Sequence, residues 1–391
     1  MMLTDRSGRV DHGDATGALA EPRVVQLQIS RYTRNLPGAN EPLEFLVAIH
    51  VEGTSITWQR NAVLPRDDEQ RMLEHIEGLR RWSAGVGLTK RTAQAAARDI
   101  GRTLRDVFLG RAGREVLTAS AATAVLLMVD ETVIHLPWEM MLDGSGAPLV
   151  LTPFGRVVTT RTAPPVGRDL ATEDPTVRIL AVENPTEDLA ATERVMEVIA
   201  GLRDVSAGVT VEVTTLERRQ ATRRGFLDAV TGRDVDIVHF AGHGRFDAQQ
   251  PGDGAVVLAD GLLTDEHVLK LRWARPPFIV INSSCESARS APGARVVSNE
   301  RRSNGLAAAF LARGVEAYLG HYFLVEDTAA ARFSETFYDT LLRQRNVGAA
   351  VQTAREHALL RFGPDADLTG FGAVYFGDAG TAERRDLATA S

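Results

Sequence analysis

The feature of this sequence that most limits its fold is a regular alternation of short apolar segments with amphipathic segments in its second half. The apolar segments include RILAVE, DIVHFA and PPFIVIN, and the intervening segments carry apolar residues at helical spacing, as in Val195, Ile199 and Leu202. Strands that alternate with helices form mostly parallel sheets with right-handed crossovers. The sequence therefore predicts an α/β fold with a doubly wound sheet and helices on both faces.

The first part of the chain has a different pattern. Two alternating segments after Arg23 predict a β-ribbon with a Pro-Gly turn, and residues 67–110 have the spacing of two helices. The Pro- and Gly-rich stretch 163–175 is the candidate boundary. We therefore expect a flexible leader (1–22), a smaller α+β N-terminal portion (23–170), a main domain (171–380) and a tail (381–391).

Composition and charge exclude several classes of protein. The net charge is −7 and no block of Lys and Arg is present, which argues against nucleic acid or anionic lipid as a partner. No apolar run approaches the roughly 20 residues of a membrane span, and the first residues lack the apolar core of a signal peptide. A single cysteine fits a reducing compartment. We expect a cytoplasmic protein, and the near absence of lysine favours a bacterial source.

Two of the predicted strands end in residues that can carry chemistry. DIVHFAGHG places His243 between two glycines, and PPFIVINSSC places Cys285, 42 residues later, directly after an apolar strand. That separation suits a return to the neighbouring parallel strand, and strand carboxyl ends are where such sheets bind ligands. A thiolate is a strong nucleophile, and an imidazole can exchange its proton with the leaving amine. The two residues are thus a candidate catalytic dyad for peptide hydrolysis.

The glycine after His243 has a second expected role. Gly244 lacks a Cβ, so the backbone can turn sharply there and a substrate carbonyl can approach closely. The amides of Gly244 and Cys285 are candidate oxyanion-hole donors, each worth about 3 kcal/mol of transition-state stabilisation.

These motifs resemble those of a known family. HFAGHG, followed by an apolar strand ending in SSCES, resembles the His-Gly and Cys signatures of the CHAT domain, a bacterial branch of the caspase-like (clan CD) cysteine peptidases. The resemblance extends from about Arg102 to Asp378 and includes LPWEMMLD, VVLADGLLT, NGLAAAFLARGVEAYLG and FGAVYFGD. It implies a caspase-like catalytic domain with His243 and Cys285 as the dyad and Gly244 as the oxyanion-hole glycine.

The sequence departs from the family pattern at two places. Ser284 stands where a small apolar residue is common, and His-Tyr-Phe at 321–323 stands where a Trp-Pro pair is common. In caspase-like folds the loop after this strand shapes the pocket for the residue before the scissile bond. The candidate substrate-pocket residues are Glu286, His321, Tyr322, Glu326 and Asp327. The last two suit a basic substrate residue, although Asp327 is equally suited to cap a helix.

The resemblance implies an endopeptidase that cleaves a specific protein without a cofactor, in bacterial defence or cell-death signalling, with a gasdermin-like effector as one candidate substrate. The tetratricopeptide repeats common in the family are absent, so control falls to the N-terminal portion or to a separate sensor or activator protein. One alternative is a catalytically silent caspase-like interaction module. A nucleotide-binding domain is a weaker alternative, because the sequence contains no phosphate-binding glycine motif.

Three further features have simpler interpretations. His239 and His243 are four residues apart on a strand, about 13 Å, which is too far for one zinc ion, so no metal site is expected. Trp138 is expected to anchor packing, and Glu139 to tie the Leu136–Asp143 corner to the second half of the chain. The arginine-rich segment 286–304 is either a solvated loop or a loop that is processed on activation.

Overall fold

The computed structural model describes residues 23–32, 41–120, 122–130, 132–159, 176–189, 192–205, 210–246, 254–273, 275–290, 305–344, 346–362 and 368–380. The predicted leader, the tail, the turn near residue 38, the boundary stretch 163–175 and most of the arginine-rich loop (291–304) lie outside these ranges. The predicted division at residue 170 therefore stays a prediction.

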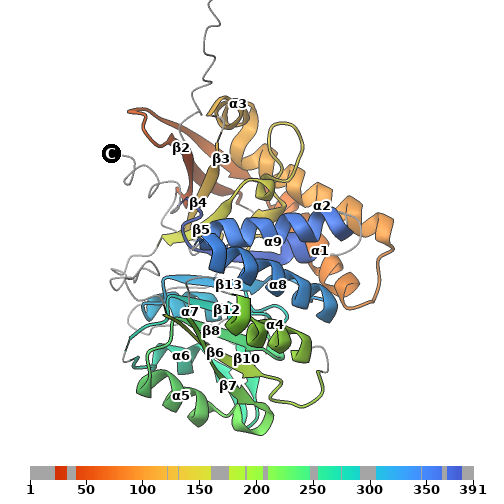
Figure 1. Cartoon of the computed structure of the whole chain (residues 1–391). Helices are drawn as coiled ribbons and strands as arrows, with labels where there is room; N and C mark the ends of the chain where they lie inside the picture. Colours follow the sequence, from red (N-terminus) through yellow and green to blue (C-terminus); the bar gives the residue numbers. More distant parts are fainter. Residues whose placement is uncertain are drawn as a thin grey trace, which may run out of the picture.

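One large sheet runs through the described part of the chain (Figure 1), with strand order β3-β2-β1-β4-β5-β14-β13-β12-β8-β6-β7. Its strands are β1 (Val24–Arg31), β2 (Leu43–Val51), β3 (Thr57–Leu64), β4 (Ala124–Asp130), β5 (Phe154–Thr159), β6 (Thr176–Glu183), β7 (Thr210–Glu217), β8 (Ile237–Ala241), β12 (Ile279–Asn282), β13 (Ala317–His321) and β14 (Ala373–Phe376). Strands β7, β6, β8, β12 and β13 pair in parallel, whereas β14 is antiparallel to β13. The mostly parallel sheet is thus confirmed.

A second, three-stranded sheet follows the histidine. It consists of β9 (Gly244–Arg245), β10 (Ala255–Leu258) and β11 (Gly261–Thr264), all antiparallel. The hairpin of β10 and β11 occupies the segment VVLADGLLT, and Gly261 at its turn has a positive φ of 132°, which favours glycine.

Helices cover both faces of the large sheet. They are α1 (Arg66–Ser83), α2 (Lys90–Leu104), α3 (Gly110–Ser120), α4 (Thr192–Val205), α5 (Arg223–Gly232), α6 (Asp265–Leu269), α7 (Leu306–Ala312), α8 (Asp327–Gln344), α9 (Val347–Phe362) and α10 (Thr369–Gly372). One core contains residues of α4, α8 and α9, and a second core contains residues of α5, α6, α7 and the N-terminal helices. None of the helices described here is long and apolar enough to cross a membrane.

The N-terminal ribbon is part of the large sheet. β1 pairs antiparallel with β2, as predicted, and its other edge pairs in parallel with β4. The strand β3 and the helix α3 were not predicted from the sequence. β3 lacks a clear apolar pattern because only Ala62 and Leu64 of its eight residues are buried. α3 continues from α2 through a π-helical turn at Arg105–Leu109, which interrupts the helical spacing.

The corner around Trp138 is buried, as expected of a packing anchor. The Trp138 indole donates a hydrogen bond to the carbonyl of Val133 (2.9 Å), and its ring packs edge-on against Phe108 (4.9 Å between centroids). Both aromatic side chains are fully buried, so this contact fixes the end of the N-terminal helices against the corner.

Glu139, the next residue, lies in a buried cluster of charges. Its carboxylate accepts hydrogen bonds from the guanidinium of Arg156 on β5, one of them from Nε (2.9 Å), and lies 3.9 Å from Arg355 on α9. Arg355 also donates to the carbonyls of Phe154 (2.8 Å) and Ala373 (2.7 Å). All three charged side chains are fully buried. The cluster joins the corner to β5, α9 and β14, which confirms the expected tie.

Burial lowers the pKa of Arg355 to about 10, so this guanidinium remains charged at neutral pH. Glu139→Gln therefore leaves two buried positive charges without a counter-charge. We expect it to lower the free energy of unfolding by about 3 kcal/mol or more, measured by urea denaturation. Glu115→Gln, which removes one partner of the exposed Arg111–Glu115 pair, is the matched control and should change it by less than about 0.5 kcal/mol. Equal effects of the two variants would contradict this role for Glu139.

Candidate active site

The register of two parallel strands brings the predicted dyad to one edge of the sheet. β8 pairs with β12 from Ile237 opposite Ile279 to Phe240 opposite Asn282. His243 lies three residues after Phe240, and Cys285 lies three residues after Asn282. Both residues thus leave the sheet at its carboxyl-terminal edge, on neighbouring strands, as the sequence predicted.

The chain segments that carry the dyad are in direct contact through Gly244. A Cβ atom at this position would lie 2.4 Å from the carbonyl oxygen of Cys285 and 2.9 Å from the Cβ of Ser284. No side chain fits into that space, so glycine is required for the backbone after His243 to approach Cys285. This contact places the Gly244 and Cys285 backbones side by side, which is the arrangement that a shared oxyanion hole needs.

Hydrogen bonds hold the loop around Cys285. Asn282 accepts a bond from the Ser284 amide through Oδ1 (3.1 Å), and its carbonyl accepts one from the Ser287 hydroxyl (2.8 Å). The amide of His321 in turn donates to Ser287 Oγ (2.9 Å), which ties the loop to the end of β13. Cys285 is half-buried within this loop.

The next residue is strained. Glu286 has a φ of 55°, a left-handed conformation that is uncommon for a residue other than glycine. Such backbone strain is often found at functional sites. Here it turns the chain sharply, directly after the nucleophile.

The imidazole of His243 has an acidic partner that the analysis of the sequence missed. Nε2 of His243 lies 3.1 Å from both carboxylate oxygens of Asp188, in the loop after β6. Thr186 donates to Asp188 Oδ1 (2.5 Å), and this bond, followed by the contact with His243, holds the pKa of Asp188 below its ordinary value. The carboxylate is therefore ionised at neutral pH, and it engages Nε2, which leaves Nδ1 as the second ring nitrogen.

The loop that carries Asp188 is fixed by Asn184. The side-chain amide of Asn184 donates to the carbonyl of Leu189 (3.1 Å), and its oxygen accepts from the Leu189 amide (3.2 Å). The loop reaches His243 because β6 is the other neighbour of β8 in the sheet. The predicted parallel sheet held a weak signal for Asp188, since the polar end of RILAVENP should reach the same edge of the sheet as the dyad.

His239 has a structural environment. It is fully buried, with Nδ1 2.9 Å from the Tyr338 hydroxyl and Nε2 3.0 Å from Ser283 Oγ. Burial, with a smaller contribution from His321, lowers its pKa to about 3, so the ring is neutral. Its role as a strand residue is confirmed, and within the described ranges no group of three or more His, Cys, Asp or Glu residues is arranged to hold a metal ion.

The candidate pocket residues fall into two groups. Glu286 forms an ion pair with Arg289, and the ring of Tyr322 lies 5.9 Å from the same guanidinium, so these two residues share one neighbour. His321 is buried and packs edge-on against Phe333. Glu326 is exposed and accepts a bond from Thr328 (2.5 Å), and Asp327 begins α8. The structure brings Glu286 and Tyr322 to one guanidinium, and the backbone of His321 bonds to the same loop at Ser287.

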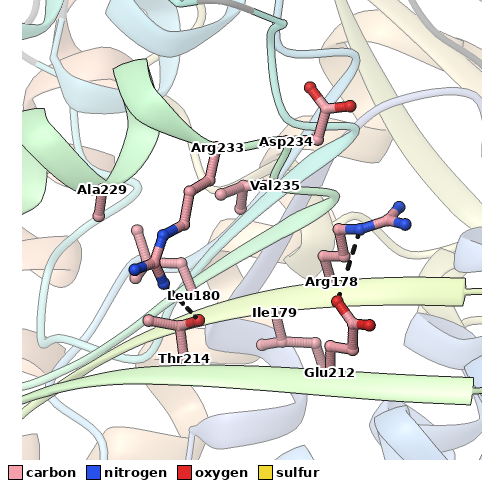
Figure 2. A pocket seen from close by; sticks show the side chains of 9 residues that line it. All are labelled: Arg178, Ile179, Leu180, Glu212, Thr214, Ala229, Arg233, Asp234 and Val235. Atoms are coloured by element: carbon pink, nitrogen blue, oxygen red, sulfur yellow. Dashed lines mark hydrogen bonds and ion pairs between the residues drawn. The ribbon is translucent and has the colours of Figure 1, made fainter.

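A separate pocket of about 260 Å³ lies at the opposite end of the sheet. Figure 2 shows Arg178 of β6 paired with Glu212 of β7 (3.6 Å), and Arg233 bonded to Thr214 (3.4 Å). These residues lie toward the amino-terminal ends of the strands, whereas His243 and Cys285 follow their carboxyl-terminal ends. Since doubly wound sheets carry their chemistry at the carboxyl-terminal edge, this pocket is distinct from the candidate active site.

Comparison with solved structures finds folds of the same type. Two structures of the Saccharomyces cerevisiae separase–securin complex match, with TM-scores of 0.57 and 0.51 at 11% and 12% identity; they cover 91% and 90% of this chain. The chain spans 30% of the separase chains in both. The Arg-specific cysteine proteinase gingipain R matches with a TM-score of 0.45 at 13% identity, over 80% of this chain and 75% of that one.

Comparison with curated proteins finds no match. Comparison with protein families finds the CHAT domain over residues 98–363, close to the range expected from the motifs. The caspase-like architecture predicted from the sequence is confirmed by the sheet and by the separase structures. Because the family match covers more than half of the chain, the protein belongs to the CHAT-domain family, whose fold is that of the caspase-like (clan CD) cysteine peptidases.

Proposed function

We propose that this protein is a cysteine endopeptidase that uses Cys285 as its nucleophile and His243 as its base. The observation that carries the proposal is the parallel register of β8 and β12, which leads both residues to one edge of the sheet. The close approach of Gly244 to the Cys285 backbone supports it independently. Membership of a family with a caspase-like peptidase fold agrees with this chemistry.

In the first half of the reaction, Nδ1 of His243 accepts the thiol proton and the sulfur attacks the carbonyl carbon of the scissile peptide bond. The carbonyl electrons move onto the oxygen, where the amides of Gly244 and Cys285 stabilise the negative charge. Collapse of this intermediate breaks the C–N bond, and His243 returns the proton to the departing amine. The product is a thioester between Cys285 and the substrate.

In the second half, His243 takes a proton from water as the water oxygen attacks the thioester carbonyl. The C–S bond then breaks, the carboxylic acid product leaves, and the proton returns to the sulfur. Asp188 contributes throughout by orienting the imidazole and by stabilising the imidazolium that forms in each half. No cofactor takes part in these steps.

The proposed substrate is a specific protein, with a gasdermin-like effector in bacterial defence or cell-death signalling as the leading candidate. The proposed regulator is the N-terminal portion or a separate sensor or activator protein. The support for regulation within the chain is that α1 lies close to the loop after the nucleophile, with 4.0 Å between Arg80 and Glu286.

Cys285→Ala should abolish cleavage of the substrate while leaving the circular dichroism spectrum unchanged. The measurement is proteomic identification of new protein termini in cells that express either form. Ser284→Ala is the matched control and should keep activity, because among the described residues the Ser284 hydroxyl, although buried, has no hydrogen-bond partner. If Cys285→Ala produced the same new termini, the proposal would be wrong, and a silent interaction module that leaves cleavage to another peptidase would replace it.

Asp188→Asn should lower kcat by about 10- to 100-fold with little change in KM, because the carboxylate orients the base and does not contact the substrate. The exposed Asp228, paired with Arg224, offers a control: Asp228→Asn should leave both constants unchanged. In the unaltered protein the pKa of Asp188 is lowered, so its carboxylate is ionised and orients His243 at neutral pH. This contribution to kcat should be lost only as the pH falls below the ordinary aspartate range, about pH 4. An unchanged kcat in Asp188→Asn would remove Asp188 from the mechanism.

A further inference from the structure

Arg289 lies in an enclosed site beside the nucleophile. Its side chain is 13% exposed, and its Nη1 bonds to the carboxylate of Glu286, whose side chain is 12% exposed. The guanidinium carbon lies 4.7 Å from the centre of the Phe246 ring and 5.9 Å from that of Tyr322. One carboxylate and two aromatic rings thus surround a single cation. We refer to Glu286, Phe246 and Tyr322 as the arginine cage.

The arginine cage is built from the same segments that carry the dyad. Glu286 directly follows Cys285, and Phe246 follows His243 by three residues at the end of β9. Tyr322 follows the last residue of β13, the strand that pairs with β12 on the side away from β8. A group bound in the cage is therefore adjacent to the reacting carbonyl in the proposed mechanism.

The cage keeps a negative character of its own. On α1, Arg80 bonds to Glu77 (2.8 Å) and lies 4.0 Å from Glu286. The bond with Arg80, and more weakly the charge of Arg289, hold the pKa of Glu77 below its usual value. Glu77 is thus held by Arg80 and is also close to Arg81. Without Arg289, the Glu286 carboxylate would keep only the longer contact with Arg80, so the empty cage would favour another cation.

The fit of Arg289 in the cage is incomplete. Its Nε is buried and, among the residues that the structure describes, finds no acceptor. Leaving a buried donor unpaired is unfavourable, and Glu286 reaches the guanidinium from a strained backbone conformation. An arginine side chain from a bound peptide is not fixed by the backbone at Arg289, so it can compete with the resident arginine for the cage.

We propose that the arginine cage is the binding pocket for an arginine side chain of the substrate next to the scissile bond, and that Arg289 occupies it until the substrate displaces it. The inference rests on the proposed function, since it assigns the pocket of the same site. It names the substrate class, a peptide with arginine before the bond that is cut. Arg289 acts as an internal competitor of that arginine.

The test compares two peptidyl chloromethyl ketones that are identical except for a terminal arginine or leucine. In both, the Cys285 sulfur displaces chloride and forms a thioether, and the labelling rate is followed by intact mass. We expect Arg289→Ala to speed labelling by the arginine reagent by about tenfold or more, and labelling by the leucine reagent by less than about twofold. Arg289→Gln, which keeps most of the side-chain length, should give the same selective gain if the alanine variant is unstable.

Two further variants sharpen the result. Arg71→Ala is the control. It removes the arginine of an ion pair with Asp68 within α1 (2.5 Å), and it should leave both labelling rates unchanged. Glu286→Gln combined with Arg289→Ala should lose the gain, because the carboxylate that holds the cation is then absent. An equal acceleration of both reagents, or a gain that survives Glu286→Gln, would overturn the pocket assignment.

Failure of the proposed function has a different signature. In that case neither reagent would label Cys285 faster in the unaltered protein than in His243→Ala. Labelling that depends on His243 but does not distinguish arginine from leucine in any Arg289 variant would keep the peptidase and reject only the arginine pocket.

Discussion

The parallel pairing of β8 with β12 is the constraint on which the rest of the site depends. Val238, Phe240 and Val280 enter one core, and Ile237 and Ile281 enter the other. A shift of one residue would exchange these two sets of side chains between the faces of the sheet, so packing on both faces fixes the register. The same register determines where the chain leaves the sheet after Phe240 and after Asn282, and therefore where the imidazole and the thiol lie.

The other parts of the site are attached to this pair of strands. β6, on the far side of β8, supplies the loop with Asp188, and β13, on the far side of β12, supplies Tyr322. The N-terminal portion continues the sheet through β4 and β5, and the buried cluster of Glu139, Arg156 and Arg355 ties it to α9 and β14. That cluster and the Arg80–Glu286 contact both cross between the two portions, so α1 directly contacts the loop after Cys285.

Much of this arrangement was predictable from the sequence because it depends on patterns within single segments of the chain. β8 and β12 are continuous apolar segments with reactive residues directly after them, so their strands, their pairing and the positions of His243 and Cys285 followed from pattern and spacing. The edge strand β3 was missed because few of its side chains are buried. Its assignment depends on pairing with β2, which is a tertiary contact.

The parts of the site that were not predicted also depend on tertiary contacts. Asp188 lies in a polar loop with no periodic pattern, and its role appears only when the order of β6 beside β8 is known. The arginine cage combines residues from three separate segments, and Arg289 was one of several arginines in a loop expected to be solvated. His321, expected in a substrate pocket, is buried against Phe333. Side-chain contacts between distant segments are not encoded in the spacing of either segment alone.

The most direct test of the central claim is the rate at which iodoacetamide alkylates Cys285. Because Cys285 is the only cysteine in the sequence, the alkylation of thiols reports on this residue alone. If His243 and Cys285 exchange a proton, the unaltered protein should react at about pH 6, where an ordinary thiol is protonated, at least about tenfold faster than His243→Ala. The same rate and the same dependence on pH in both proteins would show that the imidazole does not reach the sulfur, and would contradict the account.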